Sequence, residues 1–364
     1  MIRLILVNFL WINLLPLLQL EAQYDASIRL NDIRILASHN SYKKKPDKRI
    51  IKFLSRFKRR LGASLNPIRI DYGHVTLSQQ FNEYGIRGIE LDLYNDPWGG
   101  HFERRRINRF ILGLRQHSRD SVMKKPGIKM LHIADVDYES HYRTFSEALA
   151  EINAWSQSHP GHIPLFINLE LKNASPGDYT RILRMLGFKR AITFDSAAFV
   201  EIDQTIRQHF RDSTLFTPQM LRDTFSTTSE RLSTMGWPSL NAMLGKVIFI
   251  LDGNEASYKR FSSQHLAFSY GQVGKPETAF VIRNNPVEHE TEISALSDTY
   301  IVRTRTDVET MEARTNDYTM FNSAMRSRAQ ILSTDYYMPD ISLSRYSVSL
   351  EPYKTQKSRC FILR

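Results

Sequence analysis

The chain has 364 residues, of which 42% are hydrophobic and 24% charged, a composition that fits a globular protein with a substantial core. Its single cysteine, Cys360, excludes a fold held together by intramolecular disulfides. The formal net charge of +11 favours contact with an anionic partner, but charge alone does not distinguish nucleic acid, acidic lipid and polyanionic glycans.

The first residues have the pattern of a signal peptide. Arg3 precedes an apolar run over residues 4–20, and the small residue Ala22 offers a cleavage point. The alternative is an uncleaved membrane anchor, because the run is near the upper length of a signal peptide, although Pro16 interrupts it. We therefore expect a signal peptide at 1–22 and a secreted or periplasmic protein.

Eight short apolar or β-branched runs predict strands, and segments with helical spacing lie between most of them. Strands that alternate with helices predict a parallel sheet, and eight such units predict closure into a TIM-type (β/α) barrel. Because no linker divides the chain, residues 23–364 are expected to form a single catalytic domain. The predicted strands span 33–38, 86–93, 128–133, 165–171, 247–251, 279–282, 300–302 and 330–332, and the predicted helices include 144–156, 176–186 and 310–328.

Polar groups occur at the end of each of the first four predicted strands. In a parallel barrel these ends meet at one face, where active sites are assembled. Residues two apart on a strand point to the same side, so the charged pairs on the second and fourth strands are expected to face inward together. The groups are His39 and Asn40 after the first strand, Glu90 and Asp92 on the second, His132 at the end of the third, and Glu170 and Lys172 on the fourth.

Several carboxylates buried together require a cation or a set of donors, and Ca²⁺ accepts carboxylate and amide oxygens as ligands. A salt bridge from the acidic pair to Arg87 or Lys172 is the structural alternative. The candidate calcium ligands are Asn40, Glu90, Asp92 and Glu170.

Two histidines, His39 and His132, are placed to flank a substrate held over such a cation. Paired imidazoles suit phosphodiester cleavage, in which one group takes a proton from the attacking hydroxyl and another protonates the leaving oxygen. Lys172 is a candidate for neutralising the phosphoryl oxygens. Asp135 and Asp137 follow His132 and are candidates for orienting it or contacting the substrate. Each histidine also has an ordinary structural interpretation.

The motifs resemble the calcium-dependent phosphoinositide phospholipase C proteins of bacteria and fungi, in order and over roughly residues 30 to 350. The matching segments are SHNSY at 38–42, GIRGIELDLYNDP at 85–97, KMLHIADVDYES at 129–140, HPGHIPLFINLELKN at 159–173, GKVIFILDGN at 245–254, TYIVRTRTD at 299–307, EARTND at 312–317 and AQILSTDYY at 329–337.

This resemblance implies that His39 and His132 are the catalytic pair and that the four candidate ligands bind calcium. It also implies that the inositol 2-hydroxyl attacks the phosphodiester, diacylglycerol leaves and a cyclic inositol phosphate forms. His132 would protonate the leaving group, and His39 or Glu90 would take the hydroxyl proton.

Three other functions remain open from the sequence: another barrel phosphodiesterase of the glycerophosphodiester or sphingomyelin type, a non-catalytic module that binds anionic lipid or glycans, and nucleic-acid binding. The last lacks any recognisable motif, so we expect no nucleic-acid partner.

Two basic segments, 43–60 and 104–125, follow the first and second predicted strands and so belong on the active-site face. We expect them to dock the enzyme, as a monomer, on anionic membranes that contain a phosphoinositide-type substrate.

Overall fold

The structure is a computed structural model that describes residues 24–61, 65–262, 264–350 and 360–363. The predicted signal peptide at 1–22 lies outside the described residues. Within those residues, no helix combines the length and the apolar character needed to span a membrane.

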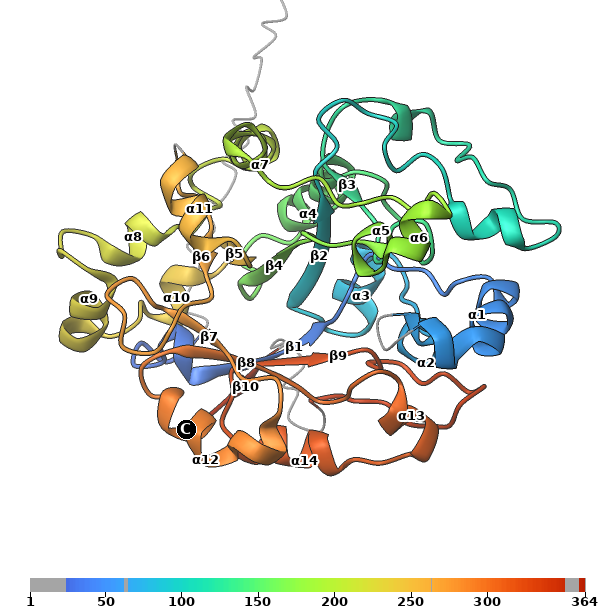
Figure 1. Cartoon of the computed structure of the whole chain (residues 1–364). Coiled ribbons are helices and arrows are strands. Elements are labelled where there is room, and N and C mark those ends of the chain that lie inside the picture. The colour runs from blue at the N-terminus through green and yellow to red at the C-terminus, as the bar shows by residue number, and fades with distance from the viewer. Residues whose placement is uncertain (1–23, 62–64, 263, 351–359, 364) are drawn as a thin grey trace, which may run out of the picture.

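Within the described residues, eight parallel strands form a nearly closed barrel (Figure 1) in the order β6-β5-β4-β2-β1-β9-β8-β7. The β6 and β7 edges are joined by a single parallel bridge between Tyr270 and Phe280. The predicted TIM-type barrel is therefore confirmed. Its strands are β1 Ile33–Ser38, β2 Gly88–Tyr94, β4 Leu165–Leu171, β5 Val247–Asp252, β6 Phe268–Ser269, β7 Phe280–Ile282, β8 Ile301–Arg305 and β9 Ile331–Thr334.

Side chains inside the barrel change from apolar to charged along the strands. In register, Gly88 pairs with Phe166, and four residues further along β2 Asp92 pairs with Glu170. On the other side of the barrel, Arg303 pairs with Ile331. Because alternate residues of a strand face the interior, this register closes the amino-terminal end with an apolar layer and gathers acids and bases at the carboxyl end.

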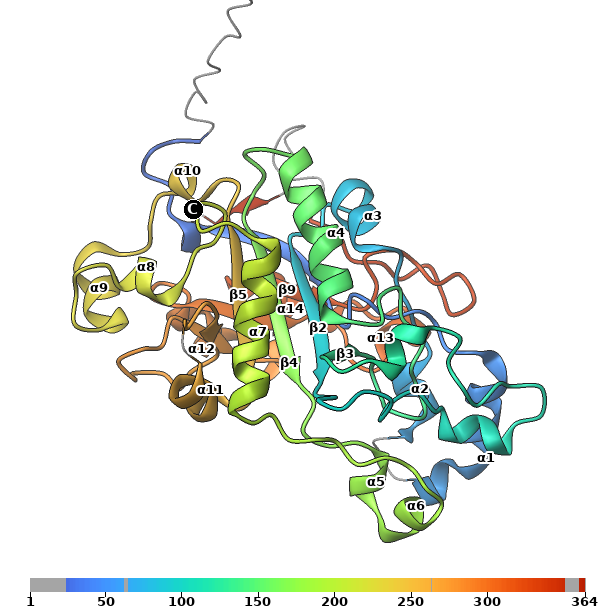
Figure 2. The same ribbon diagram turned by 90° about the horizontal axis from the view of Figure 1, so that it is seen from above.

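Helices cover the outside of the barrel, as Figure 2 shows for α4 and α7 lying across β2, β4 and β5. α4 (Phe145–Ser158) buries Ile152 and α7 (Ser196–His209) buries Ile202 in the same core as Leu169 of β4. The outward-facing residues of the strands therefore form a second core, between sheet and helices.

The prediction of a third barrel strand at 128–133 is wrong. Only Lys129–Met130 form a strand, β3, which is antiparallel to β2 and lies off the barrel. The chain then turns sharply, because Ile133 and Asp137 exchange two backbone hydrogen bonds of 2.9 Å around Asp135, whose φ is +67°. The eighth barrel strand is instead β6, too short at two residues to produce a sequence pattern.

The remaining elements are a short C-terminal strand and the helices of the connecting segments. The C-terminal β10 (Phe361–Ile362) pairs antiparallel with β1, beside the buried Cys360. The other helices are α1 Lys48–Leu61, α2 Pro67–Ile70, α3 Leu77–Glu83, α5 Pro176–Tyr179, α6 Arg181–Met185, α8 Pro218–Arg222, α9 Thr228–Met235, α10 Leu240–Met243, α11 Glu255–Phe261, α12 Pro286–Leu296, α13 Met311–Thr315 and α14 Thr319–Arg326, with 3-10 turns at Leu30–Asp32, Arg106–Phe110 and Ser121–Lys124.

Candidate active site

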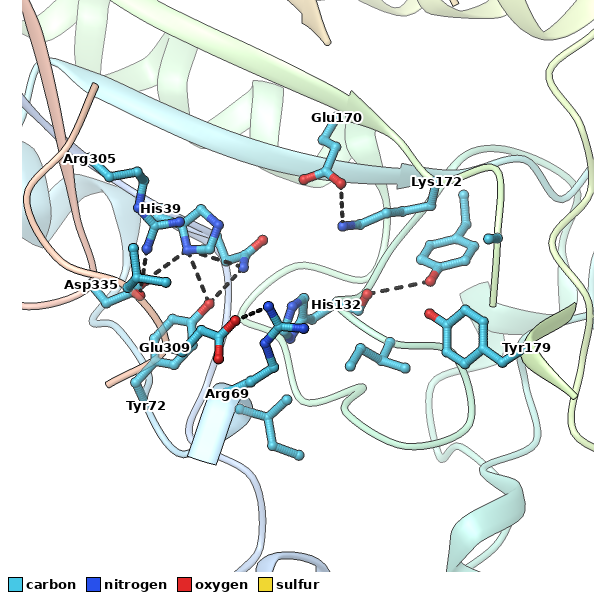
Figure 3. Close-up of a pocket in the computed structure, with 16 residues that line it drawn as sticks. His39, Arg69, Tyr72, His132, Glu170, Lys172, Tyr179, Arg305, Glu309 and Asp335 are labelled. Atoms are coloured by element: carbon cyan, nitrogen blue, oxygen red, sulfur yellow. Dashed lines mark hydrogen bonds and ion pairs between the residues drawn. The ribbon is translucent and has the colours of Figure 1, made fainter. Parts of the chain in front are cut away.

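A pocket of about 380 Å³ opens at the carboxyl end of the barrel, and both predicted catalytic histidines line it (Figure 3). Its walls come from the carboxyl ends of β2, β4 and β8 and from the segments after β1, β3, β4, β8 and β9. Residues widely separated in sequence therefore meet there, as expected for a parallel barrel. The lining residues are His39, Asn40, Arg69, Ile70, Tyr72, Tyr94, His132, Ile133, Glu170, Lys172, Ala174, Tyr179, Arg305, Val308, Glu309 and Asp335.

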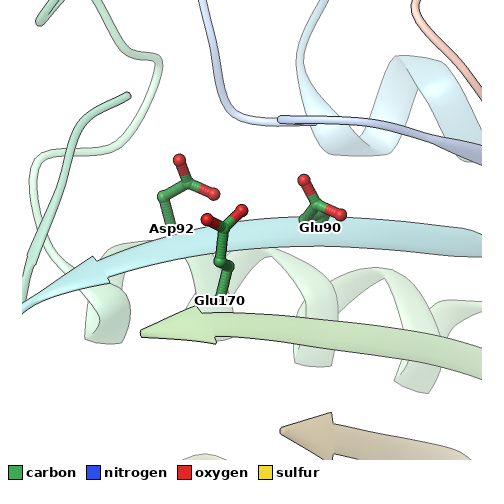
Figure 4. Close-up of side chains that lie close together, drawn as sticks. All are labelled: Glu90, Asp92 and Glu170. Carbon is green, nitrogen blue, oxygen red and sulfur yellow. The ribbon is translucent and has the colours of Figure 1, made fainter. Parts of the chain in front are cut away.

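Three predicted metal ligands form a carboxylate cluster on the adjacent strands β2 and β4 (Figure 4). Glu90, Asp92 and Glu170 each offer an oxygen within 4.8 Å of the others. Burial, together with repulsion from Glu170 and Glu90, raises the pKa of Asp92 well above its ordinary value, although Lys172 opposes this. Ionising all three carboxylates together is therefore unfavourable, and a divalent cation bound among them would stabilise their ionised forms.

Asn40, the fourth predicted ligand, lies beside this cluster in a left-handed backbone conformation, with φ of +50°. Asparagine tolerates that conformation better than most residues. Its amide nitrogen is 2.6 Å from the hydroxyl of Tyr72, which leaves its oxygen 3.0 and 3.1 Å from the two carboxylate oxygens of Asp92. With the amide reversed, its nitrogen donates to Asp92 and its oxygen accepts from the Tyr72 hydroxyl. In either orientation the amide lies against Asp92, where its oxygen is near enough to the cluster to join the ligands of a Ca²⁺ ion.

Glu90 occupies the innermost position of the carboxylate cluster. One carboxylate oxygen is bound by Arg303 and by Asn168, whose Nδ2 is 2.9 Å away. The other, Oε1, lies 3.3 Å from His39 Nε2 and accepts no hydrogen bond from the described residues. Burial raises the pKa of Glu90, but the lowering effect of Arg303 and His39 is larger, so the carboxylate stays ionised. Its Oε1 is then available to bind a cation.

Lys172 neutralises the carboxylate cluster from the side of the pocket. Its Nζ lies 2.8 Å from Asp92 Oδ2 and 2.6 Å from Glu170 Oε1. Calcium at the cluster would compete with this ammonium for the same oxygens, which would leave the ammonium available to a phosphoryl oxygen.

His39 is oriented by a carboxylate from the far end of the chain. Its Nδ1 is 2.8 Å from Asp335 Oδ1, and Arg305 donates to the other oxygen of Asp335 at 2.9 Å. Burial raises the pKa of Asp335, but His39 and Arg305 lower it more, so the carboxylate stays charged. With Nδ1 occupied, Nε2 is the nitrogen that can exchange a proton with a substrate.

His132 has the same arrangement within the turn that follows β3. Its Nδ1 is 2.8 Å from Asp137 Oδ2, so of the two acids predicted to orient His132 or to contact the substrate, Asp137 is the one that contacts His132. Asp135 instead accepts from the backbone N–H groups of Arg106 and Lys189 and holds those loops together. Burial lowers the pKa of His132, and Asp137 opposes this shift.

The structure brings all seven predicted site residues to one end of the barrel. The sequence analysis missed Asp335, Tyr72, Arg303 and Arg305. Asp335 follows a predicted strand in AQILSTDYY, so its position at a strand end was an available signal. The prediction that Lys43 belongs to a membrane-facing basic segment is wrong, because the Lys43 side chain is 0% exposed.

A parallel barrel that gathers carboxylates and imidazoles at the carboxyl ends of its strands is typical of metal-dependent hydrolases with a barrel fold. The family model "Phosphoinositide phospholipase C, Ca2+-dependent" matches residues 28–360, and the chain belongs to this family. It is therefore an enzyme, a calcium-dependent phosphoinositide-specific phospholipase C.

Solved structures support the fold. A Pseudomonas sp. calcium-dependent phosphoinositol-specific phospholipase C, described as apo form and myoinositol complex, has 17% identity and a TM-score of 0.53, with 89% of this chain and 93% of that chain covered. A second crystal of the Pseudomonas enzyme has 15% identity and a TM-score of 0.53, covering 92% and 95%. A comparison with curated proteins found no match.

Proposed function

We propose that the enzyme cleaves phosphatidylinositol-type lipids into diacylglycerol and a cyclic inositol phosphate, with His39 and His132 as the proton-transfer pair. The observation that carries this proposal is the symmetry of the pair. Both imidazoles have Nδ1 held at 2.8 Å by a buried aspartate, and both line the pocket that contains Glu170 of the carboxylate cluster. Such pairing fixes the tautomer and directs each Nε2 toward the reaction, with the Nε2 of His39 also 3.3 Å from Glu90 Oε1.

The proposed reaction is an in-line displacement within the headgroup. His39 Nε2 takes the proton of the inositol 2-hydroxyl as that oxygen forms its bond to phosphorus. The bond between phosphorus and the diacylglycerol oxygen breaks, and protonated His132 donates its proton to that oxygen.

The carboxylate cluster and Lys172 supply the electrostatic part of the reaction. Calcium held by Asn40, Glu90, Asp92 and Glu170 would neutralise charge on the phosphoryl group and favour ionisation of the 2-hydroxyl. Lys172 is proposed to bind a phosphoryl oxygen, since its ammonium contacts Asp92 and Glu170, the carboxylates that would hold the calcium ion. The Pseudomonas relative, solved with myo-inositol, is consistent with an inositol headgroup here.

Phosphorus NMR of phosphatidylinositol vesicles tests this proposal directly. The mature protein is incubated with calcium, with a chelator, and as His132→Ala in parallel. We expect a cyclic phosphodiester signal that requires calcium and that is absent in the variant. Turnover of glycerophosphodiesters alone would indicate the other barrel phosphodiesterases, and tight vesicle binding without turnover would indicate a lipid-binding module.

We also propose export after removal of residues 1–22, with 23–364 as one catalytic domain that docks on anionic membranes as a monomer. Support for docking comes from exposed cations beside exposed apolar residues on the loops after β1 and β2. Lys48, Lys52 and Arg109 are exposed, and so are Phe110 and, at 98%, Leu112. Such a mixture suits the interface of an acidic bilayer.

Charge reversal tests the docking proposal. Lys48→Glu with Lys52→Glu should weaken binding to phosphatidylglycerol vesicles at least about tenfold, since each cation near such a surface contributes about 1 kcal/mol. The matched control is Lys259→Glu with Lys275→Glu, two exposed lysines that lie outside the loops after β1 and β2. Equal binding by both double variants would contradict docking through the loop after β1.

A further inference from the structure

Lys43 lies behind the wall of the pocket and is enclosed completely, with a side-chain exposure of 0%. It follows the segment SHNSY at 38–42 and lies three residues after Asn40. Burying an ammonium costs several kcal/mol unless its charge and its donors are matched. The partners of this ammonium therefore indicate its role.

All three N–H donors of the Lys43 ammonium have an acceptor. Nζ donates to the carbonyl oxygens of Ile70 and Tyr72 at 2.8 and 2.6 Å, and lies 3.1 Å from Asp137 Oδ2. It also lies 4.4 Å from the centroid of the Tyr72 ring. An ammonium has three donors, so this set satisfies it fully.

These acceptors belong to two separate walls of the active site. Asp137 Oδ2 is the same oxygen that holds His132 Nδ1 at 2.8 Å. Tyr72 lies between the two catalytic histidines, with its ring centroid 6.2 Å from that of His39 and 6.4 Å from that of His132, and its hydroxyl contacts Asn40. One buried cation thus contacts the aspartate that holds His132 and the backbone of the tyrosine whose hydroxyl lies 3.3 Å from His39 Nδ1.

We propose that Lys43 is a positioning residue of the active site, which acts through Asp137 on His132 and through the backbone of residues 70–72 on the wall that separates the histidines. The alternative is that Lys43 serves folding alone. A buried ion pair is weak support for stability by itself, because well-packed apolar replacements are often as stable. The inference rests on the proposed roles of the two histidines.

The first test is a kinetic double-mutant cycle with Lys43→Met and Asp137→Asn, measured on a soluble short-chain phosphatidylinositol with saturating calcium. Misplacing a catalytic group by about 1 Å can cost about 100-fold in rate, so Lys43→Met should lower kcat on the order of 100-fold with KM changed much less. Because Lys43 acts largely through Asp137, the double variant should lose little more than Asp137→Asn alone. The matched control is Lys275→Met, an exposed lysine that should retain full activity.

The second test does not require turnover. The proton on His132 Nδ1, bound to Asp137, should give a downfield proton NMR signal that is absent in His132→Ala. We expect that signal in the wild type and in Lys275→Met, and its loss or marked shift in Lys43→Met. If Lys43→Met does not fold, Lys43→Gln, which keeps N–H donors without the charge, takes its place in both tests.

Wild-type kcat in Lys43→Met, losses that multiply fully in the double variant, or an unchanged His132 signal would each overturn the proposal. Absence of phosphatidylinositol cleavage by the wild type would overturn the proposed function instead. The NMR signal still reports on the Lys43, Asp137 and His132 contacts in that case.

Discussion

Both imidazoles that we propose as the proton-transfer pair are held by an aspartate, but the two aspartates lie at different distances along the chain. His132 and Asp137 are 5 residues apart in one turn, whereas His39 and Asp335 are separated by 296 positions. A spacing of five was visible in HIADVD and suggested an orienting acid. No local pattern connects the first and last strands of a barrel, so the second pair required the folded structure.

Asp335→Asn tests the longer of these pairs. An amide at this position cannot take the charge that balances a protonated His39, and it can present N–H instead of oxygen to Nδ1. We expect kcat to fall about 10² to 10⁴-fold, the usual contribution of a correctly held acid–base group. Steady-state kinetics on a soluble substrate measure the effect, with the exposed Asp298→Asn as the control. Activity within a factor of two of the wild type would exclude an essential role for the contact.

The pH dependence of kcat/KM tests the role of His132, because it reports ionisations of the free enzyme. As the proton donor, His132 must be protonated, and burial lowers its pKa below the ordinary value near 6.5. Activity should therefore fall as pH rises through a value below about 6.5. Asp137 raises the pKa of His132, so Asp137→Asn should move this limb to still lower pH. If the fall in kcat/KM at high pH occurs at the same pH in Asp137→Asn as in the wild type, that fall reports the ionisation of a group other than His132.

At the scale of elements, the strands of three or more residues were predicted from their apolar runs, whereas the two-residue strands were not. β1, at Ile33–Ser38, and β4, at Leu165–Leu171, coincide with their predicted ranges. The prediction of a barrel strand at 128–133 is wrong because the chain leaves the sheet after the two residues of β3 and enters a turn closed by Ile133 and Asp137. Apolar residues in that turn pack against neighbouring segments. A run of buried apolar residues has the same sequence pattern whether it forms a strand or a turn, so the pattern does not distinguish them.

Thr144→Ala tests a local signal that determines where α4 begins. The Thr144 hydroxyl accepts from the Glu147 N–H at 3.2 Å, and the Glu147 carboxylate accepts from the Thr144 N–H at 3.4 Å. Loss of this capping box should lower the free energy of unfolding by about 0.5 to 2 kcal/mol. Urea denaturation measures it, with the exposed Thr315→Ala for comparison. Since α4 lies outside the barrel, kcat should remain that of the wild type; a large loss of activity would link α4 to the site.

At the scale of the whole molecule, the barrel tolerates an unfavourable cluster of charge where its strands end. Glu90, Asp92 and Glu170 lie within 4.8 Å of one another and are only partly neutralised by Lys172 and Arg303. The apolar layer at the opposite end and the outer core of helices supply the stability that permits this arrangement. Both the apolar core and the charged cluster could be predicted from the sequence, since acidic residues interrupt strands that are otherwise apolar.

Calcium should consequently stabilise the entire fold, because an ion that binds only the native state adds its binding free energy to that of folding. At a concentration 100 times Kd this amounts to about 2.7 kcal/mol, which should appear as a rise of several degrees in Tm. Magnesium should have a smaller effect, since it requires a stricter octahedral geometry than a set of flexible carboxylates provides.

Glu170→Gln separates this effect from general ionic stabilisation. Removing one charged ligand should reduce the calcium-dependent rise in Tm, whereas Glu288→Gln, at a side chain that is 71% exposed, should leave it unchanged. His132→Ala should also retain the full rise, because we propose His132 as a proton donor and not as a calcium ligand. Loss of the rise in His132→Ala, or an equal rise in Glu170→Gln and the wild type, would place calcium elsewhere. Differential scanning calorimetry with calcium and with chelator therefore distinguishes the residues that hold the ion from those that transfer protons.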